Sequence, residues 1–259
     1  MHCEWNNTMP RLAIVIALAA SAPLARADVA ALADTCGASS SYDIDVGTRV
    51  LRFDRADPAP RLVEIGERSL RVDGQAIASD AATRARLVEF EQAASALLPR
   101  VRRIASDGVD LAVSALRAEA ASLGLGAATR EEIASRLDRH AVALKRRIAT
   151  STGTHAWQAE RLERELEGIV ADVAPLAAAD LGQQALAATL EGDFERSAEL
   201  QQKAFGLVDE LQPRLERRMQ PLRARIEALC PELERLHRLQ RDFRDAHGQP
   251  LHLLDIEAG

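Results

Sequence analysis

Apolar side chains recur at every second position between Ser41 and Ala78, in short runs separated by turn-forming residues. Alternation of this kind predicts strands with one buried face. The Asp73-Gly74 pair between two such runs is a strong signal for a two-residue hairpin turn. We therefore expect about five short antiparallel strands, joined as a meander, within residues 28–78.

Beyond the strands, the apolar spacing changes to steps of three and four residues and keeps this period to about Ala246. Such spacing is typical of amphipathic helices that bury one face. The sequence therefore predicts an α+β protein, in which a small antiparallel sheet precedes a helical region over residues 79–246. Residues 247–259 lack the period, so we expect a frayed tail there; the alternative is a short docked strand formed by the leucines of this segment.

Caps and prolines predict where the helices begin and end. Ser79 or Asp80 can cap the first helix, and Pro99 suits the first turn of a new helix, so we expect the first one to end just before it. Thr129 with Glu132 is a capping box that opens the third helix.

A longer apolar seam marks the C-terminal part of the helical region. Proline interrupts the seam three times, and each proline removes a backbone donor, which predicts a kinked helix or two to three helices laid end to end. The seam is either core of this chain or a surface that contacts a partner, and both interpretations stay open. Its residues are Val208, Leu211, Leu215, Met219, Leu222, Ile226, Leu229, Leu233 and Leu236, and the prolines are Pro213, Pro221 and Pro231.

The N-terminal segment has the pattern of an export signal. The unbroken apolar run Leu12–Ala20 leads into the small-residue cleavage signal of Ala25 to Ala27. The run is shorter than the roughly 20 apolar residues that span a bilayer, so it predicts a cleaved signal peptide over residues 1–27 and not an integral membrane protein. Met9 competes with Met1 as the true start. We expect a periplasmic protein, with secretion beyond the outer membrane as the alternative.

Cleavage would leave two cysteines, Cys36 and Cys230. Two cysteines in an oxidising compartment usually pair, so we expect a disulfide. Redox-active pairs generally lie close together as C-x-x-C next to the start of a helix. The wide separation of these two therefore favours a structural bridge.

Charge and composition disfavour some classes of binding partner. The expected mature chain has 31 basic and 38 acidic residues, a formal charge of −7. This balance disfavours nucleic acid, because phosphate binding depends on clustered Lys and Arg. Aromatic residues make up only 3% of the chain, which leaves few rings to stack on sugars.

Three sequence blocks carry a resemblance to a known family. They are LRVDGQAI at Leu70–Ile77, LLPRVRRIASDGVDLAVSAL at Leu97–Leu116 and LCPELERL at Leu229–Leu236. Together with one early and one late cysteine, they resemble the YggN family of periplasmic proteins, which contain a domain of unknown function. The resemblance extends from Cys36 to about Phe243. It implies export and an uncharacterised role.

No motif for catalysis or cofactor binding is present: there is no Gly-x-Ser-x-Gly elbow, His-Glu-x-x-His pair, phosphate-binding loop or dinucleotide fingerprint. His237, His247 and His252 are ten and five residues apart, whereas helical metal ligands are spaced by three or four, so we expect no metal and no cofactor. Two function classes remain. The first is a non-catalytic binding or structural module of the cell envelope, whose amphipathic helices hold an envelope protein, a lipid or a second copy. The alternative is an envelope hydrolase or another enzyme with an unrecognised site between sheet and helices.

Overall fold

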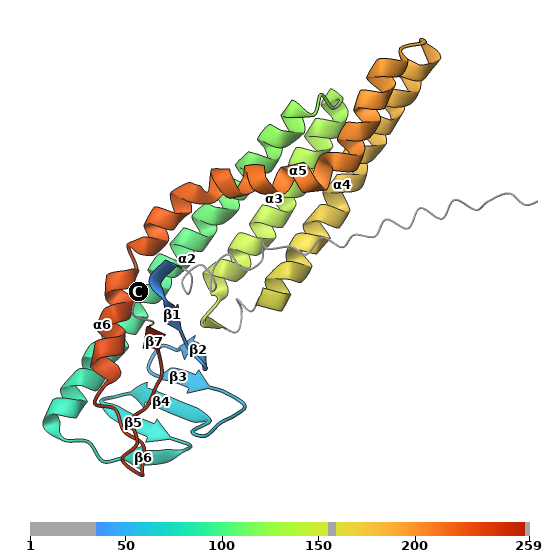
Figure 1. Ribbon diagram of the computed structural model, residues 1–259. Helices are drawn as coiled ribbons and strands as arrows, with labels where there is room; N and C mark the ends of the chain where they lie inside the picture. The colour runs from blue at the N-terminus through green and yellow to red at the C-terminus, as the bar shows by residue number, and fades with distance from the viewer. Residues whose placement is uncertain (1–34, 155–158, 257–259) are drawn as a thin grey trace, which may run out of the picture.

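The chain forms a small β-sheet at one end of a bundle of long helices (Figure 1). This computed structural model describes residues 35–154 and 159–256, without the side chains of residues 159–163, 166, 206–213, 215 and 216. The predicted signal peptide, residues 1–27, lies outside the described residues. The predicted α+β class is confirmed.

The main sheet is antiparallel, and each strand pairs with the next one along the chain. The meander that the alternation predicts is therefore confirmed. Its turns include the expected Asp73-Gly74 pair, with φ of 48° and 80°, and a second pair at Glu67 and Arg68, with φ of 52° and 62°. Positive φ at both central residues gives a turn whose twist matches that of the flanking strands. The strands are β2 Asp43–Val46, β3 Leu51–Asp54, β4 Leu62–Gly66, β5 Ser69–Val72 and β6 Gln75–Ile77.

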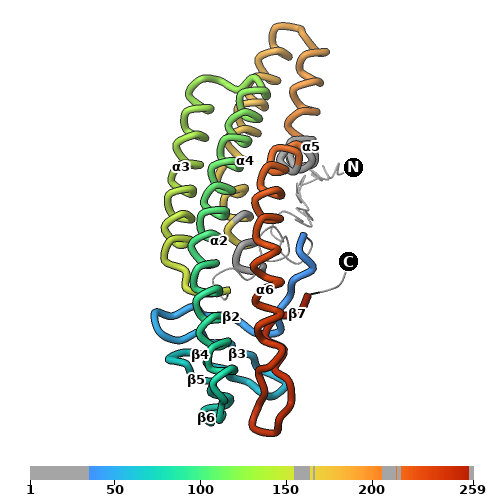
Figure 2. The backbone as a smooth tube through the Cα atoms, turned by 90° about the vertical axis from the view of Figure 1, so that its left-hand side faces the viewer, coloured from blue at the N-terminus to red at the C-terminus, as the bar shows by residue number. Residues whose placement is uncertain are grey.

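Long helices follow the sheet: α2 Ala81–Ser122, α3 Ala127–Thr150, α4 Ala159–Leu190, α5 Phe194–Glu227 and the shorter α6 Cys230–Gln240. α2 starts beside the sheet and continues into the bundle, where α3, α4 and α5 lie along its far half (Figure 1, Figure 2). The hairpin of α4 and α5 projects beyond the turn between α2 and α3, and α5 and α6 return the chain to the sheet.

α2 is one continuous helix, so the helix boundary predicted at Pro99 is wrong. Asp80 is the N-cap and accepts a hydrogen bond from the Thr83 N–H at 2.7 Å. A proline inside a helix removes one hydrogen bond and obstructs the preceding turn, which costs about 3 kcal/mol. Tertiary packing offsets this cost, because α2 packs on the sheet through buried Leu87 and Phe90 and farther along on α3 and α5.

Pro213 and Pro221 lie within α5, which changes direction on its way back to the sheet (Figure 1). The helix ends only at Ala228 and Leu229. Pro231 then occupies the first turn of α6, where its missing N–H leaves no hydrogen bond unmade. Of the predicted arrangements, the one observed is a kinked helix followed by a separate helix.

The start of α3 differs from the predicted capping box at Thr129, because Gly126 is the N-cap. The cap comes from α4: Asp180 Oδ2 accepts the Gly126 N–H at 3.0 Å, and Gln184 donates to Gly124 O at 3.2 Å. Hydrogen bonds from Thr129, Gln184 and Gly126 lower the pKa of Asp180 below its usual value. α4 thus holds the α2–α3 turn, and a cap supplied by another helix leaves no local pattern in the sequence.

A base core lies between the sheet, the start of α2, α6 and the C-terminal segment. Four rings run through it in successive contact: Tyr42, Phe53, Phe90 and Phe243, with centroids 6.4, 6.1 and 5.4 Å apart. These distances lie in the range in which edge-to-face and tilted pairs attract each other. Half of the chain's eight aromatic residues are therefore used to join sheet, helix and C-terminal segment.

The two ends of the described chain meet beside α6. The pairing predicted from the cysteine count is confirmed: Cys36 and Cys230 are bonded, with Cα atoms 5.2 Å apart. Next to this bridge, β1 (Ala38–Ser39) pairs antiparallel with β7 (Asp255–Ile256) in a separate two-stranded sheet. The bridge and the strand pair fix both ends to the same helix.

Of the two expectations for residues 247–259, a frayed tail or a docked strand of leucines, docking is observed for the described part, although the strand itself, β7, follows the leucines at Asp255–Ile256. Leu251, Leu253 and Leu254 are buried in the base core. Gln240, itself only 3% exposed, binds their backbone: its Oε1 accepts the N–H groups of Leu253 and Leu254, both at 2.9 Å, and its Nε2 donates to Leu254 O. Ser40 Oγ also donates to Leu253 O at 2.7 Å, and His237 Nδ1 lies 2.9 Å from Leu254 O. Side chains from distant parts of the chain thus supply hydrogen-bond partners that the segment lacks in a sheet or helix.

The segment after α3 covers the free edge of the sheet at β2. The Val46 N–H donates to Thr152 O at 2.8 Å, and Asp45 forms an antiparallel bridge to Gly153. A Cβ at Gly153 would lie 2.0 Å from Ile44 O, so only glycine allows this approach. A covered edge cannot pair with the edge of another sheet.

We expect Gln240→Leu to lower the free energy of unfolding by about 2 to 6 kcal/mol, because it leaves two buried N–H groups without an acceptor at about 1 to 3 kcal/mol each. Urea unfolding of the oxidised protein measures this change. Gln249→Leu, the same substitution at an exposed position of the C-terminal segment, is the control. Equal unfolding midpoints for the two variants would contradict the role assigned to Gln240.

Candidate interaction surface

Five residues of the predicted partner-contact seam are buried, and Met219 is partly buried. The five are Leu222, Ile226, Leu229, Leu233 and Leu236. α5 packs on α2 at Gly108, where a Cβ would lie 3.2 Å from the Leu222 side chain, and α6 packs on α2 as well.

The chain's own helices cover these five residues, which favours the core interpretation of the seam. Partner contact through the seam stays a prediction. The side chains of Val208, Leu211 and Leu215 lie outside the described residues.

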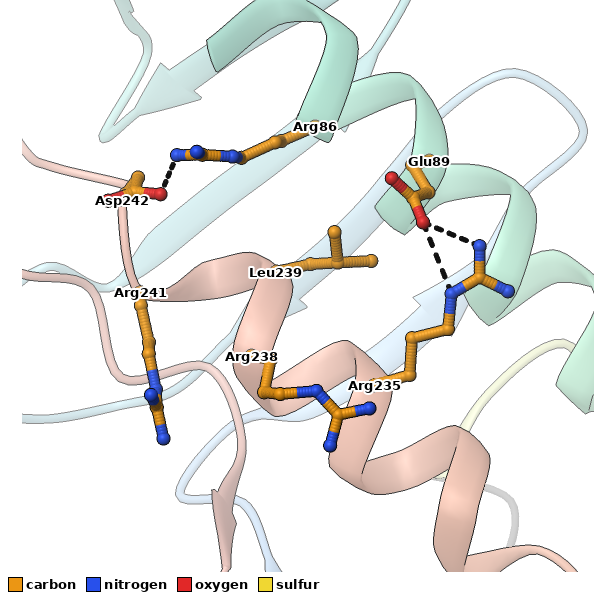
Figure 3. A pocket seen from close by; sticks show the side chains of 7 residues that line it. All are labelled: Arg86, Glu89, Arg235, Arg238, Leu239, Arg241 and Asp242. Atoms are coloured by element: carbon orange, nitrogen blue, oxygen red, sulfur yellow. Dashed lines mark hydrogen bonds and ion pairs between the residues drawn. The ribbon is translucent and has the colours of Figure 1, made fainter. Parts of the chain in front are cut away.

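An open groove of about 490 Å³ lies between α2 and α6 (Figure 3). Two ion pairs cross it on either side of Leu239: Arg86 with Asp242, and Arg235 with Glu89 at 2.5 Å (Figure 3). An enzyme site would need polar groups that converge in an apolar pocket. Here Glu89 of α2 pairs with Arg235 of α6, and Asp242, just after α6, pairs with Arg86 of α2, so the two ion pairs hold α6 on α2.

A second polar cluster joins α3 to α4. His140 Nε2 lies 3.0 Å from Asp172 Oδ2, and Arg136 donates to Asp172 Oδ1 at 2.6 Å and to Glu132 Oε1 at 2.7 Å. The hydrogen bond from His140, and then that from Arg136, lower the pKa of Asp172 below its usual value. The cluster is half-buried and lies across a helix interface, which is the arrangement of an interhelical clamp.

Glu119 provides a comparable contact between α2 and α5. Its side chain is buried and accepts from Arg214 at 3.0 Å, with Arg218 3.4 Å away. Removal of a partner from a buried ion pair is costly, because the remaining charge has lost its solvent. Among the residues that the structure describes, no three His, Cys, Asp or Glu side chains gather as metal ligands.

The α4–α5 hairpin buries mostly small residues between its helices and exposes four large apolar ones. Its helices meet at Ala185, Ala188, Ser197 and Leu200, all of which are buried. The Thr189 and Ser197 hydroxyls lie 2.8 Å apart across the hairpin. Small residues allow the two helices to approach closely, so this contact needs no further large side chain.

Four large apolar side chains of this hairpin are exposed, and we call them together the hairpin patch: Leu186, Leu190, Phe194 and Phe205, which are 61%, 81%, 69% and 84% exposed. Three of the chain's five phenylalanines are in the base core, and the other two are in this patch. Single exposed apolar residues are ordinary, whereas contiguous apolar patches are typical of interaction sites.

A known family matches most of the chain. Residues 36–253 match a family described as "Protein of unknown function (DUF2884)". The chain belongs to this family. The match begins at the first cysteine of the disulfide and ends within the docked C-terminal segment. No curated protein and no solved structure matches the chain.

The resemblance stated from sequence is thus confirmed, because YggN is the known name of the DUF2884 family. Within the described part of this DUF2884 chain, no helix combines the length and the apolar character needed to cross a membrane.

The hairpin patch is a surface that our sequence analysis missed, although a signal for it exists. Leu181, Ala185 and Ala188 recur at steps of four and three and mark the buried face of α4. On a helix of 3.6 residues per turn, Leu186 and Leu190 fall on the opposite face. A leucine pair opposite an alanine face indicates surface exposure once the alanine face is recognised as the helix contact.

We expect Leu222→Asp to lower the free energy of unfolding by about 3 to 5 kcal/mol or to prevent folding, because it buries an uncompensated carboxylate. Leu186→Asp is the matched control at an exposed position and should change the free energy by less than about 0.5 kcal/mol. Urea unfolding followed by circular dichroism compares the two. Equal stability of both variants would show that Leu222 is accessible and would favour the partner-contact interpretation of the seam.

Proposed function

We propose that the protein is exported to the periplasm and acts there as a non-catalytic binding protein that holds another protein of the envelope on the hairpin patch. The observation that carries the proposal is the placement of Phe194 and Phe205 outside the fold, in a chain with few aromatic residues. Aromatic side chains contribute a large share of the affinity of protein interfaces.

Two features support the location. The apolar run and cleavage signal of residues 1–27 have the anatomy of a signal peptide. The disulfide between Cys36 and Cys230 is of the kind that persists in oxidising compartments and is rare in the cytosol.

The architecture supports a binding role because it separates a closed base from a projecting element. The disulfide, the β1–β7 pair and the docked C-terminal segment close the base. The hairpin of α4 and α5 extends away from this base, beyond the α2–α3 turn (Figure 1). A projecting hairpin reaches a partner without a change in the base.

Site-specific photo-crosslinking in cells tests the proposal. A photoreactive phenylalanine analogue replaces Phe194 or Phe205, one at a time, and Val142 on α3, which is 68% exposed, is the matched apolar control. We expect the same discrete protein adduct from both patch positions, no such adduct from Val142, and loss of the adduct when Leu190→Ser is added. Adducts of equal yield from all three positions, or none from the patch, would reject the proposal.

A further inference from the structure

Carboxylates outnumber cations on the outer hairpin. Residues 186–205 contain Glu191, Asp193, Glu195 and Glu199, against Arg196 and Lys203. All six of these side chains are exposed. The hairpin patch therefore lies in a locally acidic setting.

Contacts within the hairpin account for three of the four carboxylates. Asp193 is the N-cap of α5 and accepts the Arg196 N–H at 3.0 Å, while Glu199 pairs with Lys203 at 2.7 Å. Glu195 lies in the first turn of α5, where a negative charge interacts favourably with the helix dipole.

Glu191 has no such explanation. It follows the last residue of α4, Leu190, at the negative end of the helix dipole, where a cation would be stabilising and an anion is unfavourable. The last turn of α4 contains no basic residue to offset it. The Glu191 carboxylate thus weakens the end of its own helix. It lies next to exposed Leu190 and three residues before Phe194, where a cation from a partner would stabilise it.

We infer that the hairpin patch binds a cationic amphipathic helix of a partner protein; this inference rests on the proposed function and names the chemistry of its partner. The apolar face of such a helix covers Phe194, Phe205 and the two leucines, and its Lys or Arg side chains lie against Glu191 and Glu195. Helices that dock this way present their apolar residues at steps of three and four. Charge selects this occupant, because an anionic membrane or the same acidic tip of a second copy would be repelled.

The direct test is binding of a synthetic 18-residue peptide that forms a helix with one leucine face and one lysine face. Fluorescence anisotropy of the labelled peptide, titrated with the purified oxidised protein, gives the dissociation constant. We expect saturable binding to one site. The combined change Phe194→Ser and Phe205→Ser should weaken it at least tenfold, and Val142→Ser, the matched control on α3, should leave it unchanged. Far-UV circular dichroism and unfolding midpoints establish that each variant is folded.

Charge variants test the electrostatic part. We expect Glu191→Gln with Glu195→Gln to weaken binding by about two- to tenfold and to reduce its dependence on salt, since exposed ion pairs contribute modestly and are screened. Two control peptides complete the design: one with glutamate in place of lysine and one with serine in place of leucine. Neither should bind at the concentrations that saturate the lysine–leucine peptide.

Three results would overturn the inference. The first is equal binding of the glutamate–leucine peptide. The second is binding of the lysine–leucine peptide that survives the double serine change. The third is that the patch binds phosphatidylglycerol vesicles, or a second copy of the chain, in place of the peptide. Failure of the proposed function is distinguishable, because it removes the position-specific adducts in cells. Adducts from Phe194 and Phe205 without peptide binding would leave a binding protein whose partner has a different chemistry.

Discussion

The side-chain amide of Gln240 is the contact on which closure of the base depends. Its oxygen accepts two backbone N–H groups of the C-terminal segment, and its nitrogen donates to a carbonyl of the same segment. Without these bonds, Leu253 and Leu254 would bring unpaired polar groups into the core, at a cost comparable to the free energy that burial of their side chains contributes. The docked segment in turn supplies β7 to β1, beside the Cys36–Cys230 bridge.

α2 connects the base core to the helical bundle. Its first half belongs to the base core, and its second half packs in the bundle against α3 and α5. Polar contacts then hold each further helix: Asp180 caps α3 from α4, Asp172 clamps α4 to α3, and Glu119 clamps α2 to α5. Ala185 and Leu200 of the hairpin belong to the core cluster shared with α2 and α3. The end of the hairpin projects beyond the α2–α3 turn (Figure 1).

The sequence was sufficient for features encoded locally. Alternation predicted the meander, the Asp73-Gly74 pair predicted its turn, and the count of cysteines in the expected mature chain predicted the pairing of Cys36 with Cys230. The sequence did not predict features that depend on contacts between residues far apart in the chain. Pro99 signals a helix boundary, yet packing along both halves of α2 overrides that signal.

The C-terminal segment and the candidate site also depend on contacts that the sequence pattern does not reveal. No periodicity predicts docking of residues 251–256, because Gln240 on α6, Ser40 and strand β1 supply their hydrogen bonds from distant parts of the chain. The seam was correctly recognised as apolar, but only the fold shows that α2 covers its described part. The hairpin patch could not be recognised before the contact face of α4 was known.

Native-state hydrogen exchange measures most directly whether the base closes as one unit. The account predicts that the Leu253 and Leu254 amides exchange only through global unfolding, with the same free energy as the amides of Phe53 and Ile65 in the sheet. Amides at the hairpin tip, such as Gly192, should exchange through smaller openings. Exchange of Leu253 and Leu254 as fast as that of Gly192, while Phe53 and Ile65 stay protected, would contradict the claim that Gln240 fixes the C-terminal segment to the base.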